Sequence, residues 1–250
     1  MGYTLRLIRQ KEIAQDAKLF EFERPVEFSY TAGQAVDLTL LNPKFSDERG
    51  MTRTFTIASA PHEKILSIAT RIGKSGFKRS LGALEVGEEV LIEGPFGSFG
   101  LSSDLSRPAV FMAGGIGITP FISMLRKSFL YRPAFSQRLS LWEKRKIFLF
   151  YVNRMKEEAA FLEELEEYGD RHKNFRFVPL YTAAKTRKTS DFERHSAILD
   201  QKFLATHLSA IKNPIFYVSG SLSFVVSMHD LILKFGATES SIRTDEFPGY

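Results

Sequence analysis

The spacing of apolar residues changes near residue 104, and this change restricts the chain to folds that combine two kinds of domain. Before it, short runs such as residues 35–40 and 65–70 alternate apolar with polar residues, and Gly, Pro or Asn separates the runs. Period-two alternation with frequent turn residues is typical of antiparallel strands. We therefore expect an antiparallel β-barrel over residues 1–104.

Beyond residue 108 the chain alternates longer apolar segments with segments of helical periodicity. Alternating strands and helices form a parallel, doubly wound α/β sheet, which we expect over residues 105–250. The expected strands are residues 109–113, 147–152, 176–180 and 214–218. The expected helices are residues 120–127, residues 156–168 with Phe161, Leu162 and Leu165 on the apolar face, and a segment that ends at Lys234.

Composition removes several classes of site. The chain has 250 residues and no Cys, which excludes disulfides, a thiol nucleophile and an iron–sulfur cluster on its own thiolates. Its five His lack metal-site spacing, so we expect no metal centre. No secretory signal pattern is present, and no segment reaches the ~18 apolar residues of a membrane span. We expect a monomeric cytoplasmic protein that does not bind nucleic acid and does not insert into a membrane.

Positive charge gathers in the second half of the chain. Residues 1–104 hold 13 Lys and Arg against 14 Asp and Glu, whereas residues 105–250 hold 21 against 15. Such a surface attracts phosphates or an acidic protein, although a solvated loop with a basic bias explains the same composition. The densest stretch contains Arg126, Lys127, Arg132, Arg138, Lys144, Arg145 and Lys146.

A glycine-rich turn follows the first strand of the second block. In residues 113–120, Gly114, Gly115 and Gly117 let the backbone approach an anion, and Pro120 suits the first turn of a helix. The position fits a dinucleotide pyrophosphate, although the segment lacks the third Gly of the Rossmann pattern. A plain tight turn is the alternative.

Arg154 stands at the end of the next strand, after Asn153. An acidic residue there would bind the ribose of NAD, whereas Arg pairs with the 2′-phosphate of NADP. The residue therefore favours NADP(H). An ion pair with the acidic segment that begins at Glu157 is the alternative.

The strand around Arg53 carries groups suited to a flavin. Alternation places Arg53, Phe55 and Ile57 on one face and Thr54, Thr56 and Ala58 on the other. Arg can bind a diphosphate, an aromatic ring can stack on isoalloxazine, and a Thr hydroxyl can form a hydrogen bond with a ring nitrogen. Composition alone shows only a strand.

Taken in order, these motifs make the chain resemble the ferredoxin-NADP(H) reductase family over nearly its full length. The segments that carry the resemblance are Arg53-Thr54-Phe55-Thr56, Ser75-Gly76-Phe77-Lys78, Gly94-Pro95-Phe96-Gly97, residues 114–120, Tyr151-Val152-Asn153-Arg154, Ser219-Gly220-Ser221 and residues 245–250.

The resemblance implies a FAD-dependent oxidoreductase that transfers hydride between NADP(H) and FAD. Electrons would then reach a separate acidic carrier, a ferredoxin or flavodoxin, docked on residues 126–146. Thr56, Ser219 and Glu246 would be catalytic, and Phe247 or Tyr250 would cover the flavin, with anchoring of the tail in the core as the alternative. The implied cofactor-binding residues are Arg53, Thr54, Phe55, Thr56, Thr70, Arg71, Ser75, Gly76, Phe77, Lys78, Gly114, Gly115, Gly117, Ile118, Thr119, Pro120, Asn153, Arg154, Gly220, Phe247 and Tyr250.

Several residues depart from the family pattern. Phe55 replaces Tyr and loses its hydroxyl, Lys78 replaces a Ser at the phosphate loop, and Ser219 replaces a Cys beside the nicotinamide.

Two other functions stay open. The acceptor can instead be an oxygenase component, a cytochrome or a small molecule, or the chain can be a nucleotide-responsive subunit without turnover.

Overall fold

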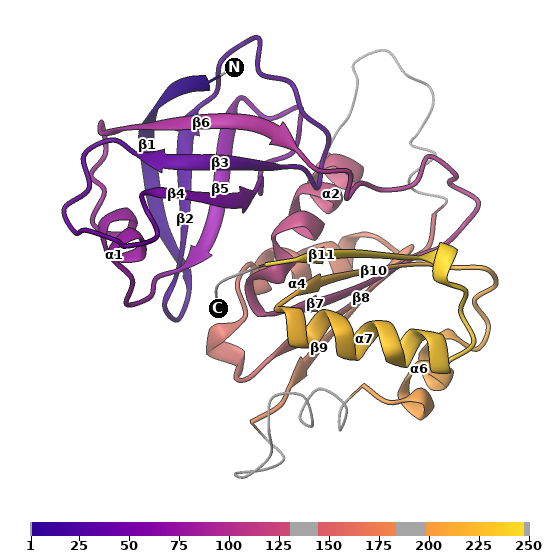
Figure 1. Cartoon of the computed structure of the whole chain (residues 1–250). Coiled ribbons are helices and arrows are strands. Elements are labelled where there is room, and N and C mark those ends of the chain that lie inside the picture. The colour runs from indigo at the N-terminus through magenta and orange to yellow at the C-terminus, as the bar shows by residue number, and fades with distance from the viewer. Residues whose placement is uncertain (1, 131–144, 184–198, 248–250) are drawn as a thin grey trace. The chain divides into compact units, whose positions relative to one another are not determined.

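The computed structural model describes residues 2–130, 145–183 and 199–247 (Figure 1). Its backbone contacts divide the chain into two compact units. The barrel unit comprises Met1–Leu101 and Thr119–Tyr131, and the sheet unit comprises Ser102–Ile118 and Arg132–Tyr250. The domain boundary expected near residue 104 stays a prediction. The backbone contacts divide the chain after Leu101 and group helix α2 (Thr119–Leu130) with the barrel unit.

The barrel unit is a six-stranded antiparallel sheet in the order β4-β3-β6-β1-β2-β5. Ile57, just beyond β4, forms an antiparallel bridge with Ile68 of β5, and this bridge closes the sheet into a barrel. The strands are β1 (Gly2–Ala14), β2 (Ala17–Glu23), β3 (Ala35–Leu40), β4 (Thr52–Thr56), β5 (Ile65–Arg71) and β6 (Glu89–Phe96), and the short helix between β5 and β6 is α1 (Gly76–Gly82).

Alternate side chains of these strands fill the barrel. In β3 the buried residues are Val36, Leu38 and Leu40, while the residues between them are partly exposed, which is the expected period of two. Phe77 and Leu81 of α1 add to the same core. The predicted antiparallel β-barrel is confirmed.

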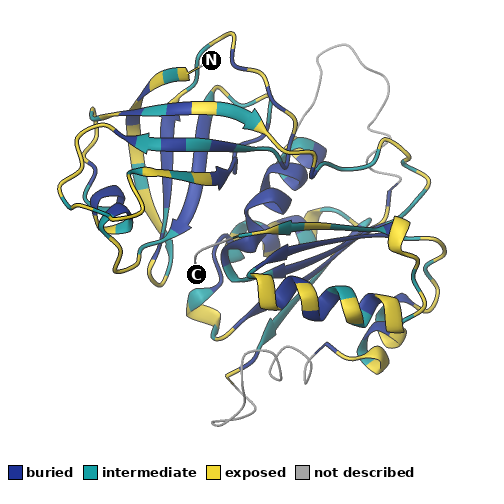
Figure 2. Cartoon of the chain, in the orientation of Figure 1, coloured by how far each residue is buried: buried dark blue, intermediate teal, exposed yellow. Residues whose placement is uncertain are grey.

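The sheet unit contains a five-stranded parallel sheet in the order β11-β10-β7-β8-β9. Figure 2 shows its central strands buried along their length. The elements are β7 (Ala109–Gly114), η1 (Gly115–Ile118), β8 (Ile147–Asn153), η2 (Lys156–Glu158), α4 (Leu162–Arg171), β9 (Phe175–Tyr181), α6 (Gln201–Leu208), β10 (Ile215–Gly220), α7 (Leu222–Lys234), η3 (Glu239–Ser241) and β11 (Ile242–Glu246).

Helices α6 and α7 bury one face of this sheet. Leu204, Phe224 and Met228 from these helices share one apolar core with Val110 and Val218 of the central strands. The outward side of α7 is exposed (Figure 2). The doubly wound α/β prediction is confirmed, because parallel strands with connecting helices form the unit.

The single helix predicted over residues 156–168 is wrong. The segment forms the short turn η2, then breaks, and α4 begins only at Leu162. Phe161 at the break adopts a left-handed conformation with φ of 59° and is buried. Burying this ring outweighs the cost of the left-handed backbone, so apolar spacing alone extended the helix too far.

Within the described ranges, no helix combines the length and the apolar character that a membrane crossing requires.

Candidate functional site

A tight turn ahead of β4 shapes the first site, in the barrel unit. The Gly50 N–H donates to the carbonyl of Asp47 at 3.0 Å, and Gly50 has φ of 74°. Asp at the first position and Gly at the fourth are typical of such turns. The Asp47 carboxylate also accepts the Arg49 N–H at 3.0 Å, which fixes its orientation.

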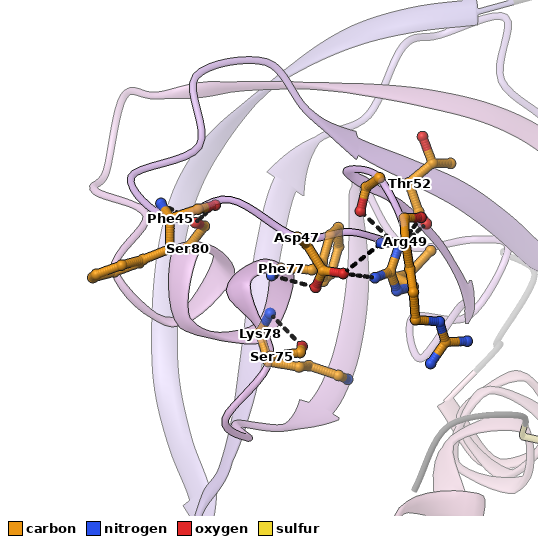
Figure 3. Close-up of polar contacts among 10 residues, drawn as sticks. Phe45, Asp47, Arg49, Thr52, Ser75, Phe77, Lys78 and Ser80 are labelled. Carbon is orange, nitrogen blue, oxygen red and sulfur yellow. Dashed lines mark hydrogen bonds and ion pairs between the residues drawn. The ribbon is translucent and has the colours of Figure 1, made fainter.

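The turn places the Asp47 carboxylate beside Phe77 of helix α1, as Figure 3 shows, and beside Arg53. One carboxylate oxygen, Oδ1, lies 3.0 Å from Nη2 of Arg53, and the other, Oδ2, accepts the Phe77 N–H at 2.9 Å. The side chain of Asp47 is only 6% exposed. The N–H donors of Phe77 and Arg49, followed by the charge of Arg53, hold the pKa of Asp47 below its usual range.

Arg53 is held firmly by its own loop. Its Nη1 donates to the carbonyls of Arg49, Gly50 and Thr52 at 3.2, 2.9 and 2.7 Å. The guanidinium also lies over the Phe77 ring, 5.0 Å from the centroid. The residue predicted to bind the flavin diphosphate therefore already binds a carboxylate.

Lys78 and Phe55 lie beside this cluster. Phe55 is buried and stacks on Phe77 with 5.9 Å between centroids, and the Lys78 ammonium lies 5.0 Å from the centroid of the Phe55 ring. Lys78 also donates to the Thr70 hydroxyl. Burial, with a smaller contribution from Arg53, lowers the pKa of Lys78 to about 8.

The other predicted flavin residues have separate contacts. Thr54 points the other way and donates to Asp37 at 2.5 Å, while Thr56 is buried. Arg71 donates to the carbonyl of Gln15 at 3.4 Å. Ser75 caps α1 by accepting the Lys78 N–H at 3.2 Å, as Figure 3 shows.

A second site lies in the sheet unit, at the carboxyl ends of the parallel strands. A Cβ added to Gly117 would lie 2.4 Å from the carbonyl oxygen of Ser219 and 2.6 Å from Cα of Gly220. At Gly114 it would meet the Phe224 ring at 2.8 Å. Gly117 thus lets the turn after β7 pack closely on the end of β10, and Gly114 lets it pack closely on Phe224 of α7. Ligands of open α/β sheets bind at this edge.

Two polar side chains at this edge are buried without a hydrogen-bond partner among the described residues. They are the hydroxyl of Ser219, at the end of β10, and the amide of Asn153, at the end of β8. A buried polar group that lacks a partner is costly, and a bound ligand is one way to satisfy it. Both residues were predicted to lie at the nucleotide.

The remaining predicted nucleotide residues are less uniform. Ile118, Thr119 and Pro120 are buried and continue from η1 into α2. Arg154 is exposed and lies 3.8 Å from Glu158, which matches the alternative ion pair with the acidic segment. Because exposed pairs are weak, this contact leaves Arg154 able to exchange partners.

The tail follows β10 in register. β11 pairs with β10 in parallel, Glu246 is exposed, and the N–H of Phe247 donates to the carbonyl of Gly220 at 3.0 Å. Tyr250 lies outside the described residues.

One residue of the basic surface predicted over residues 126–146 is buried in the structure. Arg145 is 1% exposed, and its Nη1 donates to the carbonyl of Ser102 at 3.0 Å, so the prediction that it adds to a surface patch is wrong. Lys146 is exposed. Residues 131–144, with Arg132, Arg138 and Lys144, lie outside the described residues.

Comparison with known proteins identifies two domains in the chain. The oxidoreductase FAD-binding domain matches residues 4–100, and the oxidoreductase NAD-binding domain matches residues 111–230. The chain belongs to the ferredoxin-NADP(H) reductase family of flavoprotein oxidoreductases. A flavin-binding barrel and a nucleotide-binding sheet are therefore the two parts of this family member.

Individual relatives agree with this assignment. The chain is 27% identical to a flavohemoprotein of Bacillus subtilis over 221 residues, covering 87% of this chain and 51% of that protein. It is 33% identical to a phenoxybenzoate dioxygenase subunit beta of Ectopseudomonas oleovorans, covering 63% of this chain and 46% of that protein. The fold matches a ferredoxin-NADP+ reductase from Plasmodium falciparum with a TM-score of 0.80 and 20% identity, covering 98% and 96% of the two chains. The chain thus spans about half the length of the two curated relatives.

The flavin site fits FAD in chemistry, because the Arg53 guanidinium and the Phe77 N–H already hold a carboxylate there and the Lys78 ammonium lies near the same Phe55–Phe77 stack. Its space is filled by the chain itself. A Cβ added to Gly76 would meet the carbonyl oxygen of Ser46 at 1.6 Å.

Sequence reasoning missed Asp47 and the contact between Phe224 and Gly114. The Asp-x-x-Gly spacing indicates a turn, but nothing in it shows that the carboxylate reaches Arg53. Phe224 resembles any apolar helix residue, and its contact with Gly114 depends on how α7 packs on the sheet.

Proposed function

We propose that the protein is a FAD-dependent oxidoreductase that transfers hydride between NADP(H) and FAD and passes electrons to a separate carrier. The observation that carries this proposal is the cationic cluster of Arg53 and Lys78 in the FAD-binding domain, next to Phe55. Bound flavin supplies the exchange between a two-electron hydride and single electrons.

The chain's own residues bind and orient. Arg53 and Lys78 bind the FAD diphosphate, and Phe55 and Thr56 lie along the flavin. The turn from Gly114 to Thr119 holds the nucleotide pyrophosphate, and the orphaned groups of Asn153 and Ser219 form hydrogen bonds with the nucleotide. Thr56 and Glu246 remain proposed to tune the flavin, and Phe247 or Tyr250 to cover it.

An absorption spectrum tests this function directly. The purified protein, reconstituted with FAD, should show bound-flavin bands that bleach when NADPH is added without oxygen. A folded preparation that stays colourless with FAD, or whose flavin is not reduced by NADPH or NADH, would contradict the proposal.

Preference for NADPH is expected to depend on Arg154. Replacing it with Ser should lower the ratio of kcat/KM for NADPH to that for NADH by about tenfold, because one charge-assisted contact with the 2′-phosphate is lost. The Glu158→Gln variant is the matched control and should raise the ratio, since it releases Arg154 from its ion pair. Equal ratios in all three proteins would rule out this role.

An acidic carrier protein is the proposed partner, and its docking surface includes a basic pocket in the sheet unit. The pocket is a cavity of about 620 Å³ at the amino ends of β8 and β9, and its lining includes Lys146, Arg171, Lys173 and Arg176 without a described acidic residue. Such a surface favours an acidic partner.

Charge reversal at this pocket tests the docking. The Lys173→Glu variant should raise the KM for a ferredoxin or flavodoxin about fivefold at low salt, and the difference should vanish at high salt. Lys202→Glu, an exposed change on α6, should have little effect. A salt-independent KM for the unmodified protein would remove electrostatic docking from the proposal.

A second candidate is the reductase component of an oxygenase, favoured by the similarity to the dioxygenase subunit. Titration of the NADPH-reduced protein with ferredoxin, flavodoxin and oxygenase components separates the two candidates by rate of reoxidation.

We also propose that the chain acts as a cytoplasmic monomer, with the two domains dividing near residue 104. Light scattering at working concentration tests the oligomeric state, and separate expression of residues 1–104 tests the boundary.

A further inference from the structure

Both terminal nitrogens of Arg53 lie against one short segment, Nη1 through hydrogen bonds and Nη2 through an ion pair that is not a hydrogen bond. Nη1 donates to carbonyls of residues 49, 50 and 52, and Nη2 pairs with Asp47. A guanidinium binds a phosphate best through two parallel N–H groups. A diphosphate can therefore take this pair of nitrogens only after the segment from Asp47 to Thr52 releases it.

Charge repulsion makes it unfavourable for the Asp47 carboxylate and the FAD diphosphate to bind Arg53 at the same time. The Asp47 carboxylate keeps its charge at neutral pH because backbone N–H groups and Arg53 lower its pKa. A diphosphate bound to the same guanidinium would lie within a few ångströms of this carboxylate, and like charges at that distance repel. The carbonyl of Ser46, which occupies the space over Gly76, adds a steric obstacle.

The part of the segment before Met51 lies outside the core, whereas Met51 packs against it. Ser46, Glu48, Arg49 and Gly50 are exposed, and a Cβ at Gly50 would meet nothing within 4 Å. The side chain of Asp47, in contrast, is almost fully buried. Its contacts are with Arg53 and the Phe77 N–H, the groups that the diphosphate would bind instead.

We propose that Asp47 is an internal competitor for the FAD diphosphate: the ion pair between Asp47 and Arg53 must break before the cofactor binds and therefore sets the affinity for the cofactor. This inference rests on the proposed flavin function and identifies a residue that weakens, rather than makes, cofactor binding. Asp47 thereby distinguishes flavins by their phosphates.

Titration of the apoprotein with two flavins tests the proposal. FAD carries the diphosphate and riboflavin carries no phosphate, so only FAD meets the competitor. The proteins compared are the unmodified chain, Asp47→Asn and Glu48→Gln, and binding is followed by quenching of flavin fluorescence. Glu48→Gln is the matched control, because it removes the same charge from a neighbouring exposed side chain.

Asp47→Asn is expected to bind FAD about tenfold more tightly than the unmodified chain, with riboflavin affinity changed less than about twofold. Glu48→Gln should leave both affinities within about twofold. Equal or weaker FAD binding by Asp47→Asn would overturn the proposal, as would an equal gain for riboflavin. If the folded unmodified chain and both variants bind no FAD, the proposed flavin function fails together with it.

Hydrogen exchange gives a second readout that does not depend on a variant. The Arg49 N–H now donates to Asp47, so FAD should speed exchange in residues 46–50 of the unmodified chain. Slower exchange in residues 46–50 on addition of FAD would show that the segment closes over the cofactor. It would overturn the proposal that FAD displaces Asp47 from Arg53.

Discussion

Replacing Gly117 with Ala is expected to lower the free energy of unfolding of the sheet unit by about 3 kcal/mol and to abolish oxidation of NADPH. The added Cβ would lie 2.4 Å from the carbonyl oxygen of Ser219 and 2.6 Å from Cα of Gly220. Both atoms belong to the backbone, so the turn after β7 and the end of β10 must separate. This displacement distorts the edge where the nucleotide is proposed to bind.

Urea unfolding and NADPH oxidation with an artificial one-electron acceptor check this result. Gly169→Ala is the matched control within the same unit, because its Cβ would meet only Cβ of Phe177 at 3.7 Å. Gly169 lies in helix α4, so this control should gain about 0.5–1 kcal/mol. A Gly117→Ala protein as stable and as active as the control would show that the turn does not need its close approach.

FAD affinity is expected to be about tenfold weaker at pH 9 than at pH 7, because of Lys78. Burial lowers the pKa of Lys78 from 10.5 to about 8, so much of it is neutral at pH 9 in the free protein. Bound phosphates favour the ammonium form and raise this pKa again. Binding therefore takes up a proton above about pH 8 and weakens as the pH rises, whereas below that pH Lys78 is charged in both states.

Titrations of FAD between pH 6 and 10 measure this dependence. Lys78→Met should bind FAD more weakly at pH 7 and lose most of the slope, while Lys74→Met, at an exposed neighbour, should keep it. The folded free protein should also gain stability from about pH 8 toward 10.5, since the unfolded chain holds the Lys78 proton there and the folded chain does not. A flat affinity profile in the unmodified chain would mean that Lys78 does not contact the phosphates.

Both fold classes were predictable because strand patterns are local. The alternation in β3 and the apolar runs of β7, β8 and β10 appear directly in the sequence, and their burial follows it. Arg145 shows the opposite case. It sits in a cationic run that is typical of a surface, yet tertiary packing buries it against the carbonyl of Ser102.

The candidate sites were predictable only in part. Glycines at 114 and 117 and the polar ends of β8 and β10 were visible from their place after apolar strands. Asp47 was not, because its role depends on a turn that brings it to Arg53 and to a helix about 30 residues away in sequence. Contacts between distant segments leave no periodic signal.

β4 lies at the end of the strand order, and the chain just beyond it reaches β5 through the bridge at Ile57 and the hydrogen bond from the Ala58 N–H to the Ser67 carbonyl. An outer strand presents main-chain N–H and C=O groups that no neighbouring strand uses. Part of the polar contact with a flavin on this strand can then come from the peptide groups of residues 53–56, which side-chain replacement leaves in place. Alanine variants of this strand that still bind flavin would indicate that these peptide groups contribute to binding.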